Sequence, residues 1–228
     1  MRYKNLSLLG TSHIARESVE AVNKCINEQP PGIIALELDK GRLAALGSRT
    51  KSLGIRDLWR IGLKGFLFGM LGAWAERKLG EVVHVKPGTE MLTAIKLAKK
   101  QGIPLALIDQ PIEVTLRRLS KTLTWKERFR FLWDLLKAGI TRKPEITFDL
   151  SKVPDQKIIE TLLHKVKAAY PNVYRVLITE RNDIMGKNLA HLMKQYPDKQ
   201  ILAIVGAGHE EALITIVQTY LKQVPKKE

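Results

Sequence analysis

The sequence is poor in cysteine, since Cys25 is the only one among 228 residues. One thiol cannot form an intramolecular disulfide or a CxxC pair, and a cysteine-based structural zinc site needs several. The single cysteine therefore excludes disulfide-rich secreted scaffolds and zinc-finger modules. It also favours a reducing compartment, so we expect a cytoplasmic protein, with peripheral contact to a membrane left open.

The sequence also lacks an export signal, a low-complexity tract and a flexible linker. Residues 1–13 contain only a short apolar run before the chain turns polar. Apolar residues make up 45% and charged residues 27%, as in ordinary globular proteins. No shift in composition marks a boundary, and no hydrophobic membrane domain precedes the final Lys226-Lys227-Glu228. We therefore expect a single α/β domain over residues 1–228.

No charge-free apolar run is long enough to span a bilayer. Residues 58–75 come nearest, but they include Arg60 and Lys64. Glycines at 62, 65, 69 and 72 fall on one helical face, where another backbone could approach closely. We expect a buried or subunit-contacting helix here, which is compatible with a homodimer; an interfacial membrane helix is the alternative.

Negative charge is in short supply. Thirty-eight Lys and Arg residues face 23 Asp and Glu residues, which gives a net charge of +15. Such an excess attracts nucleic acids and anionic membranes without selecting either. Because no nucleic-acid recognition motif accompanies the charge, nucleic-acid binding is the least favoured function.

One basic segment follows a capping box formed by Thr124 and Glu127. Its apolar residues form one helical stripe, opposite a face that carries several cations. A helix of this kind can rest on a membrane, bind RNA or pack against its own domain, and we favour packing. The stripe consists of Trp125, Phe129, Leu132, Trp133 and Leu136, and the cations are Lys126, Arg128 and Arg130.

Apolar strands alternate with amphipathic helices along the chain, which predicts an α/β fold with a mostly parallel central sheet flanked by helices. Strands are expected at 6–9, 32–37, 103–108 and 201–205. Helices are expected at 15–26, 91–102, 159–169, 185–193 and 213–221.

The first and last units share one design, in which a strand is followed by Gly-x-x-His and a helix. These motifs are Gly10 to His13 and Gly206 to His209, and Glu37 ends another strand. The carboxyl ends of parallel strands meet at one edge of a sheet, so these side chains should converge. Two imidazoles and a carboxylate suit a divalent metal, whereas anion binding or a structural role are alternatives. His84, His164 and His191 lack this context.

Several segments together resemble the TraB family, which includes the pheromone-shutdown proteins of bacterial conjugation and, more remotely, the Tiki metalloproteases. They follow one another in order over nearly the whole chain. The segments are Gly10-Thr-Ser-His13 with Ser18 and Val19, Glu37-Leu-Asp-Lys-Gly-Arg42, Pro87-Gly88-Thr-Glu90, Leu107-Ile-Asp109, Thr115-Leu-Arg-Arg118, Glu180-Arg181 with Met185, and Gly206-Ala-Gly-His209.

The resemblance implies an α/β fold of two related halves, shared with erythromycin-esterase and haem-uptake ChaN-like proteins, each half with a strand-GxxH-helix unit. It implies a metal held by His13, His209 and Glu37, with Glu180 as a further candidate. By the same resemblance, Arg42, Arg118 and Arg181 line the cleft and could hold a carboxylate or another anion. The motif residues expected to contact substrate are Gly10, Thr11, Glu90, Asp109, Gly206 and Gly208.

Two functions are expected, the first from this resemblance and the second from the apolar segment 58–75 and the basic helix that begins at Trp125. The first is a Mn²⁺-, Co²⁺- or Zn²⁺-dependent hydrolase of peptide or amide bonds, in which Glu37 or Glu180 takes a proton from water. The second is a non-catalytic protein that binds a pheromone-like peptide or regulates a membrane-bound partner. Two positions depart from the family pattern, since Asn182 replaces the usual aspartate and Gln110 replaces a frequent arginine.

Overall fold

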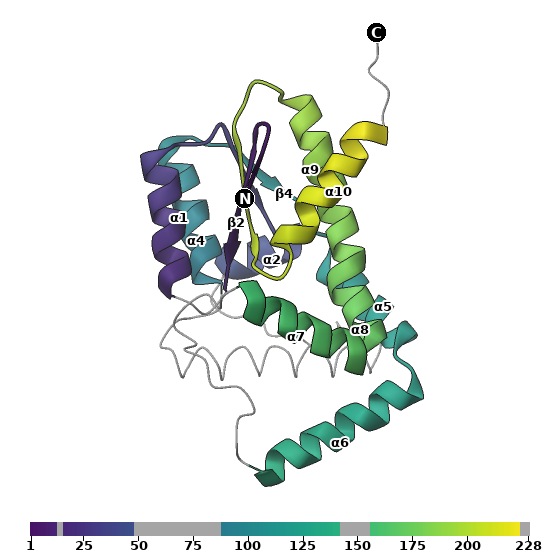
Figure 1. The fold of residues 1–228 in the computed structure, drawn as a ribbon. Helices are drawn as coiled ribbons and strands as arrows, with labels where there is room; N and C mark the ends of the chain where they lie inside the picture. Colours follow the sequence, from purple (N-terminus) through teal and green to yellow (C-terminus); the bar gives the residue numbers. More distant parts are fainter. Residues whose placement is uncertain (13–15, 48–87, 142–155, 224–228) are drawn as a thin grey trace.

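A computed structural model describes residues 1–12, 16–47, 88–141 and 156–223. Its centre is a five-stranded sheet in the order β1-β2-β5-β3-β4 (Figure 1). The strands are β1 (Arg2–Tyr3), β2 (Leu6–Thr11), β3 (Ile33–Leu36), β4 (Leu105–Leu107) and β5 (Ile201–Gly206). Only β1 is antiparallel to its neighbour. The expected α/β class with a mostly parallel sheet is confirmed.

Helices cover both faces of this sheet (Figure 1). One face is covered by α1 (Arg16–Glu28) and α4 (Thr89–Gln101), whose apolar side chains pack on Ile34, Leu36 and Ile204. The other face is covered by α9 (Glu180–Gln195) and α10 (Glu210–Gln223). All four residues of β3 are buried, as expected for a parallel strand between two helical layers.

The remaining helices lie around the carboxyl edge of the sheet and below it (Figure 1). They are α2 (Lys40–Gly47), α5 (Ile112–Thr122), α6 (Trp125–Thr141), α7 (Gln156–Ala169), α8 (Pro171–Tyr174) and the π-helical turn η1 (Arg175–Thr179). The sequence had indicated α6 and α7, but β1, α2, α5, α8 and η1 were missed. Within the described ranges, no helix is long and apolar enough to cross a membrane.

Strand β5 lies between β2 and β3, so the last strand of the chain pairs directly with a strand near its start. Leu6 pairs with Ile201 and Thr11 pairs with Gly206. The segments that follow β2 and β5 therefore leave the sheet side by side at the same edge. The two Gly-x-x-His units begin one residue apart in register, because Gly10 pairs with Val205 and Gly206 pairs with Thr11. His13 itself and residues 58–75 lie outside the described residues.

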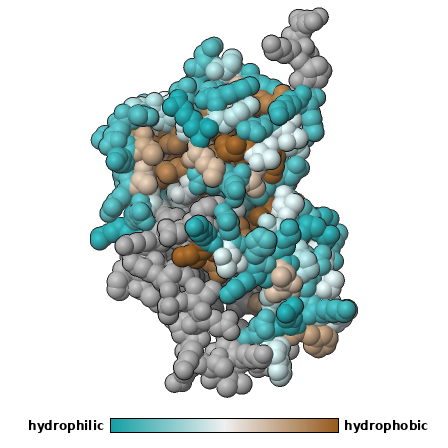
Figure 2. Space-filling model, in the orientation of Figure 1, coloured by the Kyte–Doolittle hydropathy of each residue, from teal (hydrophilic) through white to brown (hydrophobic). Residues whose placement is uncertain are grey.

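Helix α6 differs from the expectation that its apolar stripe packs on the domain. The capping box is present, with Glu127 accepting from the backbone N–H of Thr124 at 3.0 Å. Trp125, Phe129 and Trp133 are nevertheless 69%, 67% and 59% exposed. Figure 1 shows α6 projecting away from the sheet, and Figure 2 shows polar residues over much of the molecule's visible surface.

Candidate functional site

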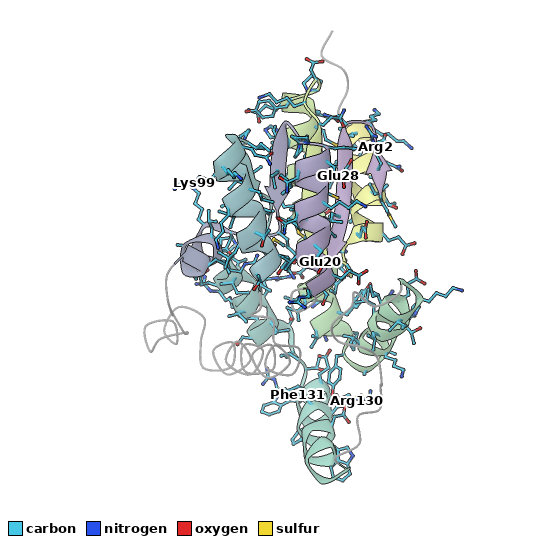
Figure 3. The ribbon with its side chains drawn as sticks, turned by 90° about the vertical axis from the view of Figure 1, so that its left-hand side faces the viewer. Arg2, Glu20, Glu28, Lys99, Arg130 and Phe131 are labelled. Carbon is cyan, nitrogen blue, oxygen red and sulfur yellow. The ribbon has the colours of Figure 1, made fainter. Side chains whose placement is uncertain are left out.

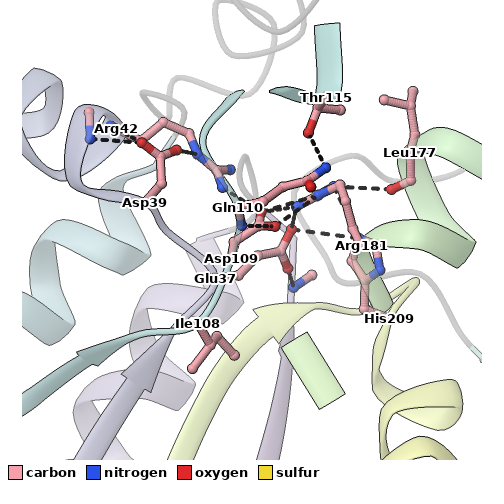
Figure 4. A network of polar contacts seen from close by, with 12 residues as sticks. Glu37, Asp39, Arg42, Ile108, Asp109, Gln110, Thr115, Leu177, Arg181 and His209 are labelled. Atoms are coloured by element: carbon pink, nitrogen blue, oxygen red, sulfur yellow. Dashed lines mark hydrogen bonds and ion pairs between the residues drawn. The ribbon is translucent and has the colours of Figure 1, made fainter. Parts of the chain in front are cut away.

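Charged side chains from four elements meet at the carboxyl edge of the sheet (Figure 4). Glu37 follows β3, Asp109 follows β4, and His209 lies between β5 and α10. Arg181 reaches them from the first turn of α9. We call these four residues the central cluster. Each comes from the chain just after a strand or at the start of a helix, so the sheet and α9 fix their positions.

Arg181 is the hub of the central cluster. Its Nη2 donates to Glu37 Oε1 and, at 2.6 Å, to Asp109 Oδ2, while Nε donates to Asp109 Oδ2 at 3.1 Å. Its Nη1 donates to the carbonyl of Leu177 at 3.2 Å. Burial alone would lower the pKa of Arg181, but Glu37 and Asp109 outweigh it and raise the pKa above its ordinary value. The guanidinium therefore remains charged at every working pH.

Glu37 joins the central cluster to the backbone of β5. Its Oε2 accepts from the backbone N–H of Gly206 at 2.7 Å, and its Oε1 faces Arg181 and His209. The distance from Glu37 Oε1 to His209 Nε2 is 3.5 Å. The side chain is only 3% exposed, so it is held in one orientation and largely shielded from water.

Asn182 forms a hydrogen bond with the ring nitrogen of His209 that does not face Glu37. The imidazole Nδ1 donates to the Asn182 amide oxygen at 2.5 Å, and both residues are buried. This hydrogen bond places a ring hydrogen on Nδ1, so in the neutral imidazole Nε2 carries the lone pair and faces Glu37 and Arg181. Metal-binding histidines are commonly oriented in this way by an acceptor behind the ring.

A second layer of ion pairs surrounds Asp109. Its Oδ2 also accepts from Arg42 Nη2, and its Oδ1 accepts from the Gln110 backbone N–H at 2.8 Å. Arg42 in turn pairs with Asp39, whose Oδ2 is 2.7 Å from Arg42 Nε. Together with Glu37 and Arg181, these groups comprise three carboxylates and two guanidiniums. Their formal charges therefore sum to one negative charge, apart from His209 and any ligand.

A cavity of about 190 Å³ adjoins the central cluster. Asn182 and Gly208, the immediate neighbours of His209, form part of its lining. A Cβ on Gly208 would lie 3.8 Å from Leu163, in ordinary van der Waals contact, so the cavity wall has room for a small side chain at this position. The cavity also has an apolar contribution from Ile178 and charged contributions from Lys167 and Glu211. It is large enough for one side chain or a small ligand group.

The π-helical turn η1 positions the start of α9. The backbone N–H of Glu180 bonds to the carbonyl of Arg175, five residues earlier, and α9 continues directly from there. Such turns are rare and often occur at functional sites. Here the turn ends at Thr179, two residues before Arg181; Arg181 and Asn182 then bind Asp109 and His209 from adjacent positions.

Several residues predicted from the sequence do lie together: Glu37, Asp109, Arg181, Gly206 and His209, with Arg42 behind them. Thr11 and Gly10 lie at the end of β2, where a Cβ on Gly10 would be 2.3 Å from the Glu210 carboxylate. Only glycine fits at that position without a shift of Glu210.

Other predicted residues do not reach the central cluster through any contact seen in the described residues. Arg118 and Glu180 form their own bidentate pair, at 2.6 and 3.1 Å. Glu90 is buried in the first turn of α4. His13 lies outside the described residues, so its predicted role as a metal ligand stays a prediction.

Two contributors were missed as functional residues. Asp39 lies within the motif Glu37 to Arg42, but the sequence predicts no role for it. Asn182 is predicted only to differ from the family pattern. Both positions carried a usable signal, because a polar residue directly after a strand or beside Arg181 faces the same sheet edge. Gln110, the other departure, donates to Thr115 Oγ1 at 2.7 Å.

Comparison with known proteins identifies the family of this chain. The sequence model that describes the TraB/PrgY/gumN family matches residues 3–212. The chain belongs to this family. The TraB family match includes every residue of the central cluster, and the resemblance drawn from the motifs is confirmed.

The chain is also similar to individual proteins of the TraB family. It is 35% identical over 226 residues to the uncharacterized protein MJ1365 of Methanocaldococcus jannaschii, covering 96% of this chain and 54% of that protein. It is 25% identical over 189 residues to human and to mouse TraB domain-containing protein, covering 77% of this chain and 49% of each relative. The chain thus spans about half the length of these curated relatives.

Proposed function

We propose that this protein is a divalent-metal-dependent hydrolase of peptide or amide bonds, with the central cluster as its active site. One observation carries the proposal: buried Asn182 fixes the ring of His209 so that Nε2 lies 3.5 Å from Glu37 Oε1. An imidazole nitrogen and a carboxylate oxygen that face each other in this way are a suitable donor pair for Mn²⁺, Co²⁺ or Zn²⁺.

The donor set fits a metal but requires a further ligand. Within the residues that the structure describes, no three His, Cys, Asp or Glu side chains form a metal-binding group. The sequence predicts His13 as the third ligand, and it follows two residues after Thr11, which pairs with Gly206. A bound divalent ion would supply a water with a pKa lowered toward ~7 and would polarise the scissile carbonyl.

The chain's own groups divide the remaining tasks. Glu37 keeps its place in the donor pair because the backbone N–H of Gly206 holds Oε2 and leaves Oε1 to face His209. Arg181 offers a permanent positive charge for a developing oxyanion or a substrate carboxylate. The adjoining cavity can receive a substrate side chain and shield the reacting bond from bulk water.

Calorimetric titration of chelator-treated protein with Mn²⁺, Co²⁺ and Zn²⁺ tests the metal site. We expect about one ion per chain for at least one metal, with binding lost in His209→Ala because Nε2 is removed. His191→Ala is the matched control, since His191 is an exposed histidine of α9. It should bind as the wild type does. Metal-dependent cleavage in a mixed peptide library, measured by mass spectrometry, would then establish hydrolysis.

Equal metal binding by His209→Ala and the wild type would contradict the proposed site. Absence of binding by the wild type would contradict the metal-dependent mechanism itself. Far-ultraviolet circular dichroism of each variant separates these results from simple unfolding.

A second candidate function is peptide capture without turnover. It is favoured by the pairing of Glu37 and Asp109 with Arg181, because carboxylates already neutralised by a guanidinium are poorer metal ligands. In that case the cleft residues hold a peptide carboxylate or backbone and release it unchanged. Retention of intact library peptides, with no cleavage products in the presence of metal, would favour this second function.

A further inference from the structure

Helix α6 carries three exposed aromatic side chains in a single row. Trp125, Phe129 and Trp133 follow one another at intervals of four residues, so they lie on one side of the helix. They are the most exposed large apolar side chains among the described residues. The Trp125 and Phe129 ring centroids are 6.1 Å apart. We call this row the aromatic face.

The opposite side of α6 attaches the helix to the rest of the molecule. Buried Glu127 accepts from the Asn172 backbone N–H at 2.7 Å and from its side-chain amide at 2.9 Å. Asp134 accepts from the Tyr170 hydroxyl at 2.5 Å, and Phe131 packs edge-on against the same tyrosine. The acidic side chains of α6 are therefore engaged away from the aromatic face.

Cations border the aromatic face on both sides. At about 100° per residue, Arg128 falls beside one edge of the row, and Lys126 and Arg130 fall beside the other. The Arg128 guanidinium lies 5.0 Å from the centroid of the Trp125 ring. Figure 3 shows Arg130 and Phe131 on this helix, which lies apart from the sheet. Exposed rings flanked by cations, with the carboxylates turned inward, give α6 a strongly asymmetric surface.

We propose that the aromatic face docks on the surface of an anionic phospholipid membrane. The rings would enter the boundary between headgroups and acyl chains, while Lys126, Arg128 and Arg130 would meet lipid phosphates. The chain's net charge of +15 would add long-range attraction. Single-stranded nucleic acid would also attract these cations, but it binds in grooves that follow its backbone. A convex row of rings on a projecting helix suits an apolar phase better.

Co-sedimentation with vesicles tests the proposal directly. We expect the wild type to bind vesicles of equimolar phosphatidylcholine and phosphatidylglycerol at low salt, and not vesicles of phosphatidylcholine alone. Phe129→Ser combined with Trp133→Ser should weaken the partition coefficient roughly a hundredfold, because two rings no longer enter the bilayer. Val114→Ser is the matched control, since Val114 is 43% exposed on α5, and it should bind like the wild type.

A charge variant provides an independent test that leaves every ring in place. Lys126→Glu combined with Arg130→Glu should reduce binding to the anionic vesicles at least about tenfold. Because all of these side chains are exposed, thermal unfolding should change little in either double variant. Unchanged vesicle binding by either folded double variant would overturn the proposal. So would an absence of wild-type binding at low salt, or ring-dependent retention on single-stranded RNA without vesicle binding.

Discussion

Asn182 decides which nitrogen of His209 is available to a ligand. Its amide oxygen accepts a hydrogen bond from Nδ1 at 2.5 Å, so in the neutral ring Nε2 faces Glu37 with its lone pair. An aspartate at this position could accept the same hydrogen bond. Relative to the aspartate that the TraB resemblance implies at this position, asparagine preserves the orientation of the imidazole and removes one negative charge from a buried site.

Replacing Asn182 tests this positioning role. Asn182→Ala leaves the buried Nδ1 without its acceptor, which should lower the free energy of unfolding by about 1–3 kcal/mol. If His209 holds a metal, affinity should fall about 10–100-fold, as is typical when the group behind a ligand is lost. Asn182→Asp keeps an acceptor for Nδ1 and should therefore bind metal as the wild type does. Calorimetry gives the affinities, and nitrogen chemical shifts of His209 report its tautomer; an unchanged tautomer and affinity in Asn182→Ala would contradict the role.

Arg181 stabilises the fold because two buried carboxylates share its guanidinium. Arg181→Met removes that shared cation from Glu37 and Asp109, and we expect a loss of about 3–5 kcal/mol in the free energy of unfolding. Arg118→Met is the control, since Arg118 is half exposed and pairs with Glu180 in contact with solvent. Its unfolding midpoint in urea should stay close to that of the wild type. Similar midpoints for both variants would show that Arg181 stabilises the fold no more than Arg118 does.

At the residue scale, the sequence located the charges better than it located their partners. Glu37 and His209 could be predicted because each directly follows an apolar strand or a glycine turn. Arg181 and Asp109 required the family resemblance. The hydrogen bond from His209 to Asn182 could not be predicted, because it depends on the rotation of α9 about its own axis.

At the scale of elements, Glu127 has two structural roles. It caps its own helix through Thr124, and it joins α6 to α8 through Asn172. Burial alone would raise the pKa of Glu127, but the hydrogen bonds from Thr124 and Asn172 outweigh it and lower the pKa below its ordinary value of 4.5. The ionised carboxylate is therefore the form that holds α6 in place.

Acidification should reduce the contribution of Glu127 to the free energy of unfolding. A lowered pKa in the folded state contributes stability that is fully present above pH 4.5 and is lost as the pH falls through the folded-state value. Glu127→Gln should therefore lower the free energy of unfolding by about 1 kcal/mol at neutral pH. The difference from the wild type should narrow in acid. Melting temperatures measured from pH 7 to pH 3 check this, and a constant difference would contradict it.

Helices and strands were predicted correctly where a long apolar pattern ended at a residue that terminates such elements, such as glycine. Helix α4 ends at Gly102, whose φ of +68° suits glycine, and the sequence placed that end correctly. Strand β1 was missed because two residues at a sheet edge carry no periodicity. Helix α2 was missed because it is only eight residues long, and α5 was missed because its buried face of Thr115, Leu116 and Leu119 includes a polar residue.

At the scale of the whole molecule, the order of the strands assembles the site. Because β5 is inserted between β2 and β3, His209 is delivered beside Glu37, although most of the chain separates them. The repeated Gly-x-x-His design predicted this convergence at one sheet edge. The strand order itself could not be read from the sequence, since it depends on which helical faces pack across the sheet.

One consequence of the π-helical turn concerns insertions and deletions. The helix runs from Pro171 to Gln195 without interruption, and η1 gives it one residue more than an α-helical path would need. Deleting one residue within η1 would therefore restore an α-helical path, with Asn172 still facing Glu127 and with Arg181 and Asn182 still at the central cluster. Deleting one residue from the α-helical part of α9 would instead rotate the flanking stretches by about 100° relative to each other. The π-helical turn is thus the place where this helix should tolerate the loss of one residue.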